Sequence, residues 1–186
     1  MMIYRCVVIL VLILSFSNLN ARDEDKNTGL FGSIELSYIN HFDAHYYYQS
    51  TLYNFDIDDS HVRSINVLGG YYVIPKRLAL GFGVGIDGFQ NPYISTFPLY
   101  GDLRYFLSKK RNAPYLQLDY GGFLRLGSTF YNTGRYFKAG IGYKRFVSQK
   151  LCMTFAISYA PSKINENSQN YYLFKGIAFS IGFVLF

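Results

Sequence analysis

The sequence has no tryptophan, only two cysteines and only five prolines among its 186 residues. Charged residues are also few, at 16% of the chain, while half of all residues are hydrophobic. Cys6 lies in the apolar stretch at the start of the chain, so Cys152 has no partner in the remainder, which excludes a disulfide framework and a cysteine metal site. After that stretch, no run approaches the roughly 18 apolar residues that a transmembrane helix needs.

The first 21 residues have the pattern of a secretory signal peptide. A basic start that ends at Arg5 precedes an apolar run over residues 6–16, in which Ser15 is the one polar residue, and this run is too short to span a bilayer. A small, polar segment then leads to Ala21. We therefore expect a signal peptide over residues 1–21, a periplasmic lead over 22–28 and one domain over 29–186. An exported chain without an apolar helix can still be integral to a membrane as a closed barrel.

Residues 97–126 show two opposite faces most plainly. Leu99, Leu103 and Tyr105 alternate with polar residues, and after a break at 108–114 the apolar positions change parity, as at Leu116 and Leu118. Such alternation is typical of strands with one face in an apolar medium and the other in a polar one. The segment therefore predicts a β-hairpin.

The same alternation recurs in six further segments, at residues 30–40, 62–73, 78–89, 135–146, 151–159 and 174–186. With the hairpin this makes eight strands, each near the roughly 9 to 11 residues that cross a bilayer when tilted. The connection at 41–60 is long and Tyr-rich and is expected to be a loop, as are 90–95, 127–133 and 161–171. The other connections are short and basic. The sequence predicts an all-β, eight-stranded antiparallel up-and-down transmembrane β-barrel.

The polar face of these strands carries few charges of mixed sign. It also carries glycines such as Gly81 and Gly83, which make room inside a tightly closed wall. The expected pairing places Arg104 opposite Asp119 or Gln117. Because an eight-stranded barrel is wide enough only for its own side chains, a structural plug is favoured over a gated pore. The predicted ion-pair network of the lumen is Glu35, Asp87, Asp102, Arg104, Asp119, Arg125, Lys138 and Lys144.

The pattern and the terminal Phe183-Val184-Leu185-Phe186 resemble the small eight-stranded outer-membrane barrels of the OmpA transmembrane-domain and OmpX type. The resemblance covers the whole chain after the signal peptide. It implies a bacterial outer-membrane protein with short turns in the periplasm and long loops outside, and it identifies Phe183 and Phe186 as a signal for the assembly machinery. The chain departs from the family in one respect, because Phe186 has the opposite parity to Phe183 and points inward unless a bulge intervenes.

Two groups of outward residues are candidate binding sites. Arg63, Arg135 and Lys175 are predicted to contact lipopolysaccharide phosphates, or else to be ordinary rim charges that extend toward water. Tyr46, Tyr47, Tyr48 and Tyr53 in the first loop offer flat apolar faces with polar tips for a sugar, a cation or a host surface. The alternative is a variable connection without a ligand. The acids lack the spacing of a calcium loop and the three histidines form no metal motif, so no metal or cofactor is expected.

The leading interpretation is a non-enzymatic outer-membrane barrel with a filled polar lumen and a first loop that binds a ligand, lipopolysaccharide or a host surface. The alternatives are a narrow gated pore, a lipid A-modifying enzyme and a soluble lipocalin-like carrier. Against an enzyme, no histidine stands beside a serine in the His-x-Ser arrangement of the deacylases. A nucleic-acid partner is not expected despite a pI near 9.2, because the basic residues are dispersed.

Overall fold

The structure, a computed structural model, describes residues 27–49, 51–54, 59–127, 133–166 and 169–186. The expected signal peptide and most of the expected lead segment lie outside this part of the chain. Eight strands build a wall: β1 (Gly29–Tyr48), β3 (His61–Ile74), β4 (Leu78–Gln90), β6 (Pro98–Phe106), β7 (Ala113–Phe123), β8 (Thr133–Phe146), β9 (Leu151–Tyr159) and β11 (Tyr171–Leu185). Three short strands extend it: β2 (Thr51–Asn54), β5 (Ile94–Thr96) and β10 (Ser162–Asn165). Among the described residues, no helix has the length and apolarity that a membrane crossing requires.

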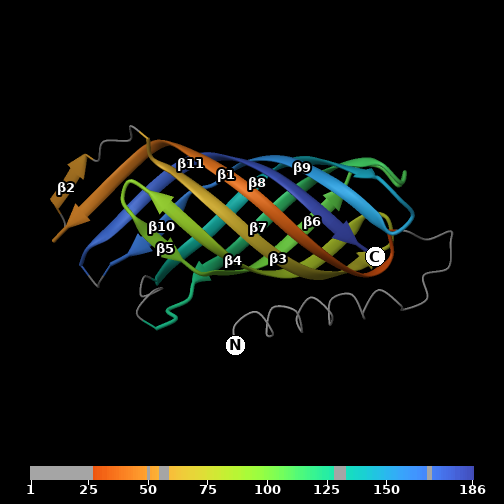
Figure 1. The fold of residues 1–186 in the computed structure, drawn as a ribbon, viewed down its shortest axis with the longest axis horizontal. Coiled ribbons are helices and arrows are strands. Elements are labelled where there is room, and N and C mark those ends of the chain that lie inside the picture. Colours follow the sequence, from red (N-terminus) through yellow and green to blue (C-terminus); the bar gives the residue numbers. More distant parts are fainter. Residues whose placement is uncertain (1–26, 50, 55–58, 128–132, 167–168) are drawn as a thin grey trace, which may run out of the picture.

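The wall is closed. Each wall strand runs antiparallel to the next along the chain, and β11 pairs with β1 from Gly32↔Leu185 to Tyr47↔Tyr171. The tilted strands therefore form a continuous cylinder (Figure 1). The predicted eight-stranded antiparallel barrel is confirmed.

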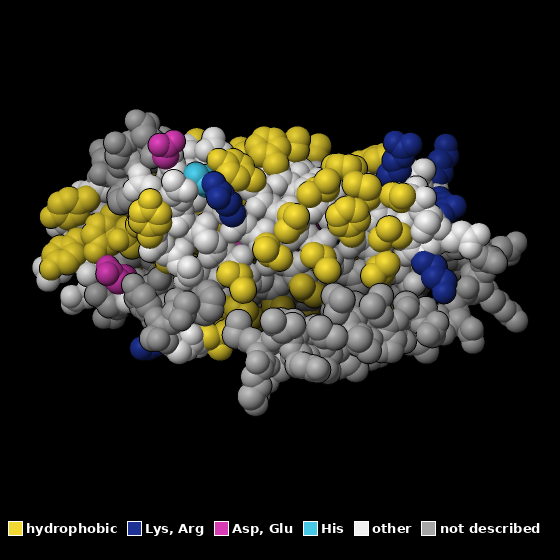
Figure 2. Space-filling view, in the orientation of Figure 1, with side chains coloured by type: hydrophobic (Ala, Val, Ile, Leu, Met, Phe, Trp, Pro, Cys, Tyr) yellow, Lys and Arg dark blue, Asp and Glu magenta, His cyan; other side chains and the backbone are white. Residues whose placement is uncertain are grey.

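Apolar side chains cover the outside of the barrel, and polar ones fill much of the inside. Along the first half of β1, the outward residues Leu30, Ile34, Leu36 and Tyr38 are 42–64% exposed, whereas the inward residue Glu35 is 5% exposed. Successive side chains of a strand point to opposite faces, so the alternation in sequence becomes an outer and an inner surface. Figure 2 shows apolar side chains spread over the wall. A soluble carrier requires the opposite arrangement, so that alternative is wrong.

The two ends of the barrel differ. The short turns at residues 75–77, 107–112 and 147–150 lie at one end together with the end of β11, and we call this the turn end (Figure 1). The other end carries β2, β5 and β10, and we call it the loop end (Figure 1).

The expected loop at 41–60 is in large part a strand pair. The pairing of β1 with β11 shifts between His41 and Asp43, so Phe42 is an additional residue, and β1 then continues to Tyr48 before the chain returns as β2. The prediction was wrong because the bulge moves the outward positions from even to odd residue numbers, and the odd positions that follow include the polar residues Asp43 and His45, so the apolar alternation does not continue. Residues 43–48 of β1, residues 171–175 of β11, and strands β2 and β10 form what we call the projecting sheet.

Two other expected loops also contain strands. Within 161–171, β10 pairs with both β11 and β8 beyond the end of β9, and within 90–95, β5 pairs back onto β4. These strands are only three or four residues long, too short for a period-2 pattern to stand out. The expected loop at 127–133 lies mostly outside the described residues.

Inward rings lie over inward glycines of the neighbouring strand. A methyl group built on Gly83 of β4 would collide with the Tyr100 ring of β6, and one on Gly142 of β8 would collide with the Tyr115 ring of β7. By contrast, a methyl group on Gly69 of β3 would meet nothing within 4 Å. The absence of a side chain at Gly83 and Gly142 therefore lets large aromatic rings lie against the inner wall.

Candidate functional site

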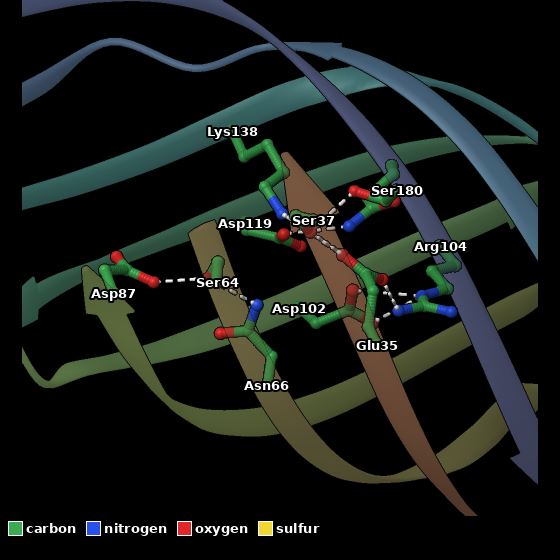
Figure 3. Close-up of polar contacts among 11 residues, drawn as sticks. Glu35, Ser37, Ser64, Asn66, Asp87, Asp102, Arg104, Asp119, Lys138 and Ser180 are labelled. Atoms are coloured by element: carbon green, nitrogen blue, oxygen red, sulfur yellow. Dashed lines mark hydrogen bonds and ion pairs between the residues drawn. The ribbon is translucent and has the colours of Figure 1, made fainter. Parts of the chain in front are cut away.

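A network of buried charges from β1, β6 and β8 occupies the middle of the barrel (Figure 3). Lys138 Nζ lies 3.1 Å from Glu35 Oε1, and Arg104 Nη2 lies 3.6 Å from Glu35 Oε2. Arg104 Nε also donates to both carboxylate oxygens of Asp102, at 3.1 and 3.0 Å. Each charge thus has a partner of opposite sign, which an enclosed site of low polarity requires.

Two serines extend this network to the strand that closes the barrel. Ser37 Oγ of β1 donates to Glu35 at 3.1 Å and accepts from Lys138 Nζ at 3.3 Å. It also lies 2.8 Å from Ser180 Oγ of β11. The network therefore links β8, β1 and β11 through their inward side chains.

Asp119 of β7 lies beside this network. It is directly opposite Asp102 in the β6–β7 ladder, and Arg104 is opposite Gln117, which is one of the two expected pairings. Gln117 Nε2 donates to Asp119 Oδ2 at 2.8 Å. Among the described residues, Asp119 makes this hydrogen bond but no ion pair within 4.0 Å.

Asp87 of β4 lies in a separate group nearer the loop end (Figure 3). It accepts a hydrogen bond from Ser64 Oγ of β3, and Ser64 accepts one from Asn66 Nδ2 at 2.9 Å. Asp87 is buried, and in the described part of the chain it is held by hydroxyl and amide groups rather than by a cation.

Lys144 of β8 lies near the turn end inside a cage of aromatic rings. Its ammonium donates to Asn27 Oδ1 and, at 3.0 Å, to the Tyr72 hydroxyl. The same nitrogen is 4.0 Å from the centroid of the Phe106 ring, within the range of a cation–π interaction. Lys144 is thus buried without a carboxylate partner among the described residues, stabilised by neutral acceptors and π faces.

The final residue contributes to this cage. The Phe186 ring stacks on Phe146 with centroids 5.4 Å apart and lies 5.8 Å from Lys144 Nζ, so it points inward as its parity predicts. Phe183 points outward and is exposed. The role of these two residues as an assembly signal stays a prediction, with Phe183 alone on the lipid-facing side.

A further aromatic layer closes the loop end. His41 stacks on Phe174, with centroids 4.7 Å apart, and on Phe89, at 5.9 Å. Its Nδ1 lies 2.9 Å from Ser60 Oγ, and Ser60 donates to the carbonyl of Asn91 at 2.9 Å. Sequence reasoning missed this contact because the two residues are 19 positions apart. The pair has the spacing of a base and a nucleophile, but rings enclose the histidine and Ser60 is only 1% exposed.

Arg125 is not in the lumen. It lies exposed beyond Phe123, where β7 ends. The ladder with β6 ends at the pair Pro98↔Phe123 and is followed by a hydrogen bond from the Leu124 N–H to the Phe97 carbonyl, so Arg125 lies beyond the paired wall. The expectation from parity was therefore wrong for this residue, while the other seven predicted lumen charges are buried inside the barrel.

The three predicted phosphate-binding cations do not form one site. Lys175 of β11 pairs with Asp43 of β1 at 2.7 Å, and Arg63 stands apart on β3, opposite Tyr38. Arg135 of β8 lies directly opposite Lys163 of β10, a residue that sequence reasoning placed in a loop and did not select.

The four predicted tyrosines lie on the projecting sheet. Tyr46 stacks on Tyr172 with centroids 4.5 Å apart, and Tyr47 stacks on Tyr171 at 4.6 Å on the opposite face. Tyr46 donates to Glu166 at 3.0 Å, and partial burial together with this hydrogen bond raises the pKa of Tyr46 to about 12. The other two predicted residues, Tyr48 and Tyr53, are exposed. Among the described residues, no group of three histidine, cysteine or acidic side chains could hold a metal ion.

No family model and no curated protein sequence matches this chain, whereas solved structures do. Neisserial surface protein A has a TM-score of 0.52 and 13% identity, over 85% of this chain and 97% of that one. OprG from Pseudomonas aeruginosa has a TM-score of 0.52 and 10% identity, over 88% of this chain and 98% of that one. The outer membrane protein AlkL in DMPC lipid bilayers has a TM-score of 0.50 and 16% identity, over 90% of this chain and 94% of that one. This chain therefore has the fold of the small eight-stranded outer-membrane β-barrels.

Proposed function

We propose that the protein is an integral outer-membrane barrel with a plugged interior and no enzymatic activity, whose projecting sheet binds a partner outside the cell. The apolar outer wall supports the membrane location, because a surface of this kind is stable against acyl chains. The turn end faces the periplasm and the loop end faces outward, since barrels of this fold place their short turns in the periplasm.

The packing of the interior supports a plug rather than a pore. The rings around Lys144 lie at the turn end, those around His41 lie at the loop end, and the charged network lies between them. Planar-bilayer recordings of the refolded protein should therefore show no large, stable conductance steps. Reproducible steps would support the gated-pore alternative.

The observation that carries the binding role is a pair of apolar rows across three strands of the projecting sheet. One row is Tyr53, Tyr46 and Tyr172, and the opposite face carries Leu52, Tyr47 and Tyr171. Stacking on a cross-strand neighbour holds the rings of Tyr46 and Tyr47 in place, so these side chains lose little rotamer freedom when a partner contacts them. Flat rings with hydroxyl edges suit sugar rings or a protein surface.

The test uses the refolded protein in nanodiscs on an array of bacterial and host saccharides. The pair of substitutions Tyr48→Ser and Tyr53→Ser removes two exposed rings and retains both rings of the stack of Tyr46 on Tyr172. We expect this variant to lose the binding of the wild type. Tyr93→Ser is the matched control, because Tyr93 is 89% exposed at the same end but lies outside the projecting sheet. Equal binding by all three proteins would contradict the role.

A different observation supports lipopolysaccharide as a partner. Arg135 and Lys163 are cross-strand neighbours of like charge, a pairing that an anion between them would stabilise, and the Lys163 ammonium lies 3.8 Å from the centroid of the Tyr171 ring. Phosphate groups of lipopolysaccharide supply such an anion at the loop end. The variant Arg135→Ser with Lys163→Ser should retain less lipopolysaccharide during purification, whereas Arg63→Ser should retain the wild-type amount. Equal retention by both variants would count against the site.

A further inference from the structure

The turn end carries an uninterrupted set of cations. Figure 2 shows Lys and Arg side chains gathered at the end of the barrel where β11 finishes. The acidic side chains of the described residues lie inside the barrel or toward the loop end, and none lies on the turns. The set, which we call the basic band, consists of Lys76, Arg77, Lys109, Lys110, Arg111, Arg145 and Lys150.

Two arginines join the three turns into one surface. Arg77 Nη1 donates to the carbonyls of Phe106 and Leu107, at 3.2 and 2.9 Å, which links residues 75–77 to the next turn. Arg111 Nη2 donates to the carbonyl of Ser148 at 2.5 Å, which links that turn to residues 147–150. The basic band is therefore continuous across the turn end.

Other cations of the band remain available to a ligand. Lys109, Lys110 and Arg145 are exposed, and in the described part of the chain no acidic side chain pairs with them. Since like charges on neighbouring turns repel one another, an anion at this surface relieves the repulsion.

The position of the basic band relative to the membrane interface indicates the chemical class of the anion. The outward tyrosines Tyr71, Tyr105 and Tyr143 lie exposed on the barrel wall next to the turns. Tyrosine favours the interface between acyl chains and headgroups. Arg145 is two residues beyond Tyr143 on the same outward face of β8, which places it about 7 Å further along the strand. The exposed cations thus lie at the level of lipid headgroups.

We propose that the basic band binds the phosphate groups of anionic phospholipid headgroups in the leaflet at the turn end. Arg145 lies on the outer wall in β8, and Lys109 and Lys110 extend from the adjacent turn, so one headgroup can be approached by cations from both the strand and the turn. The band lies at the opposite end from the projecting sheet and the Arg135–Lys163 pair, so its partner is distinct from those already proposed.

The test is position-resolved NMR of the refolded protein in nanodiscs of dimyristoylphosphatidylcholine, alone or mixed equally with dimyristoylphosphatidylglycerol. The anionic lipid should shift the amide signals of residues 76–77, 107–112 and 147–150. In the variant Lys109→Ser, Lys110→Ser and Arg145→Ser, these shifts should disappear while the barrel signals persist. The preference for phosphatidylglycerol should fall by at least about fivefold, the factor that one cation contributes near an anionic surface.

The variant Arg63→Ser, Arg135→Ser and Lys163→Ser loses the same charge at the loop end and is the matched control, which should keep the shifts at the turns. The proposal is overturned if the wild-type turns do not respond, if the turn variant responds like the wild type, or if both variants lose the response equally. Inorganic phosphate added to neutral nanodiscs should leave the turns unchanged. The same shifts with free phosphate would overturn the assignment to headgroups.

Discussion

Lys138 reaches across the barrel interior to Glu35, with 3.1 Å between Nζ and Oε1. Their strands β8 and β1 are not neighbours, because β9 and β11 lie between them in the wall. The ion pair therefore braces two sides of the cylinder instead of following the ladder. Both side chains are buried, and among the described residues Glu35 is the one ion-pair partner of Lys138 within 4.0 Å, so the loss of Glu35 leaves a buried ammonium without an opposite charge.

Glu35→Gln should lower the free energy of unfolding by roughly 3–5 kcal/mol, the cost of leaving a buried charge without its partner. Adding Lys138→Met removes that charge, so the double variant should lose less than the sum of the two single losses. Urea titration in lipid vesicles, read by gel mobility, measures both. Asp43→Asn breaks the solvent-exposed pair with Lys175 and serves as the control with little effect. Additive losses from Glu35→Gln and Lys138→Met would contradict the brace.

Gly83→Ala should destabilise the barrel by about 1–3 kcal/mol, because the new methyl group forces the Tyr100 ring away from the wall. Gly69→Ala lies in the neighbouring strand, where the methyl group has open space, and should change stability little. The same urea titration compares the two. A similar loss for both would show that the ring does not depend on the glycine.

Phe82→Lys should lower the free energy of unfolding by about 2–4 kcal/mol, because this outward side chain of β4, 76% exposed, lies between the outward apolar residues Leu80 and Val84, where a lysine meets acyl chains. Tyr71→Lys, near the turn end, should lower the free energy of unfolding by only about 0–1 kcal/mol, since the lysine reaches the headgroups. The measured quantity is the difference between the unfolding free energies of the two variants. Equal costs would mean that the wall does not span a bilayer in the proposed way.

Tyr172→Ala should loosen the projecting sheet without opening the barrel. It removes the ring that stacks on Tyr46, while the β1–β11 ladder nearer the turn end remains intact. Hydrogen exchange should accelerate in β2 and in residues 43–48, with protection retained in β6 and β7. Phe179→Ala, an outward substitution on β11 nearer the turn end, is the control and should leave hydrogen exchange in β2 unchanged.

The alternation in the sequence was sufficient to predict the eight strands of the wall. Residues 151–159 were predicted as a strand and coincide with β9, and the alternation of Leu116 and Leu118 on β7 correctly indicated the outward face. This success has a physical basis, since each strand must satisfy lipid on one side and the lumen on the other. The observed pairing of Arg104 with Gln117 is one of the two that counting across the turn left open, the other being Asp119.

The parts that sequence reasoning missed depend on relations between distant residues. The bulge at Phe42 depends on how β1 meets β11, and the end of β7 depends on where its ladder with β6 stops. The contact of His41 with Ser60 and the opposition of Arg135 and Lys163 likewise require the register of the sheet. None of these has a local signal, because every residue involved is compatible with a loop.

The seam between β1 and β11 joins the first and last strands of the wall. Its register pairs, such as Gly32↔Leu185, connect residues separated by nearly the whole domain, so the seam can form only after every intervening strand has been placed. A chain that stops before β11 would leave β1 and β9 with unpaired backbone edges, which favour aggregation. Folding of this barrel is therefore expected to finish at the seam, and a truncated chain is expected to be a substrate for proteolysis.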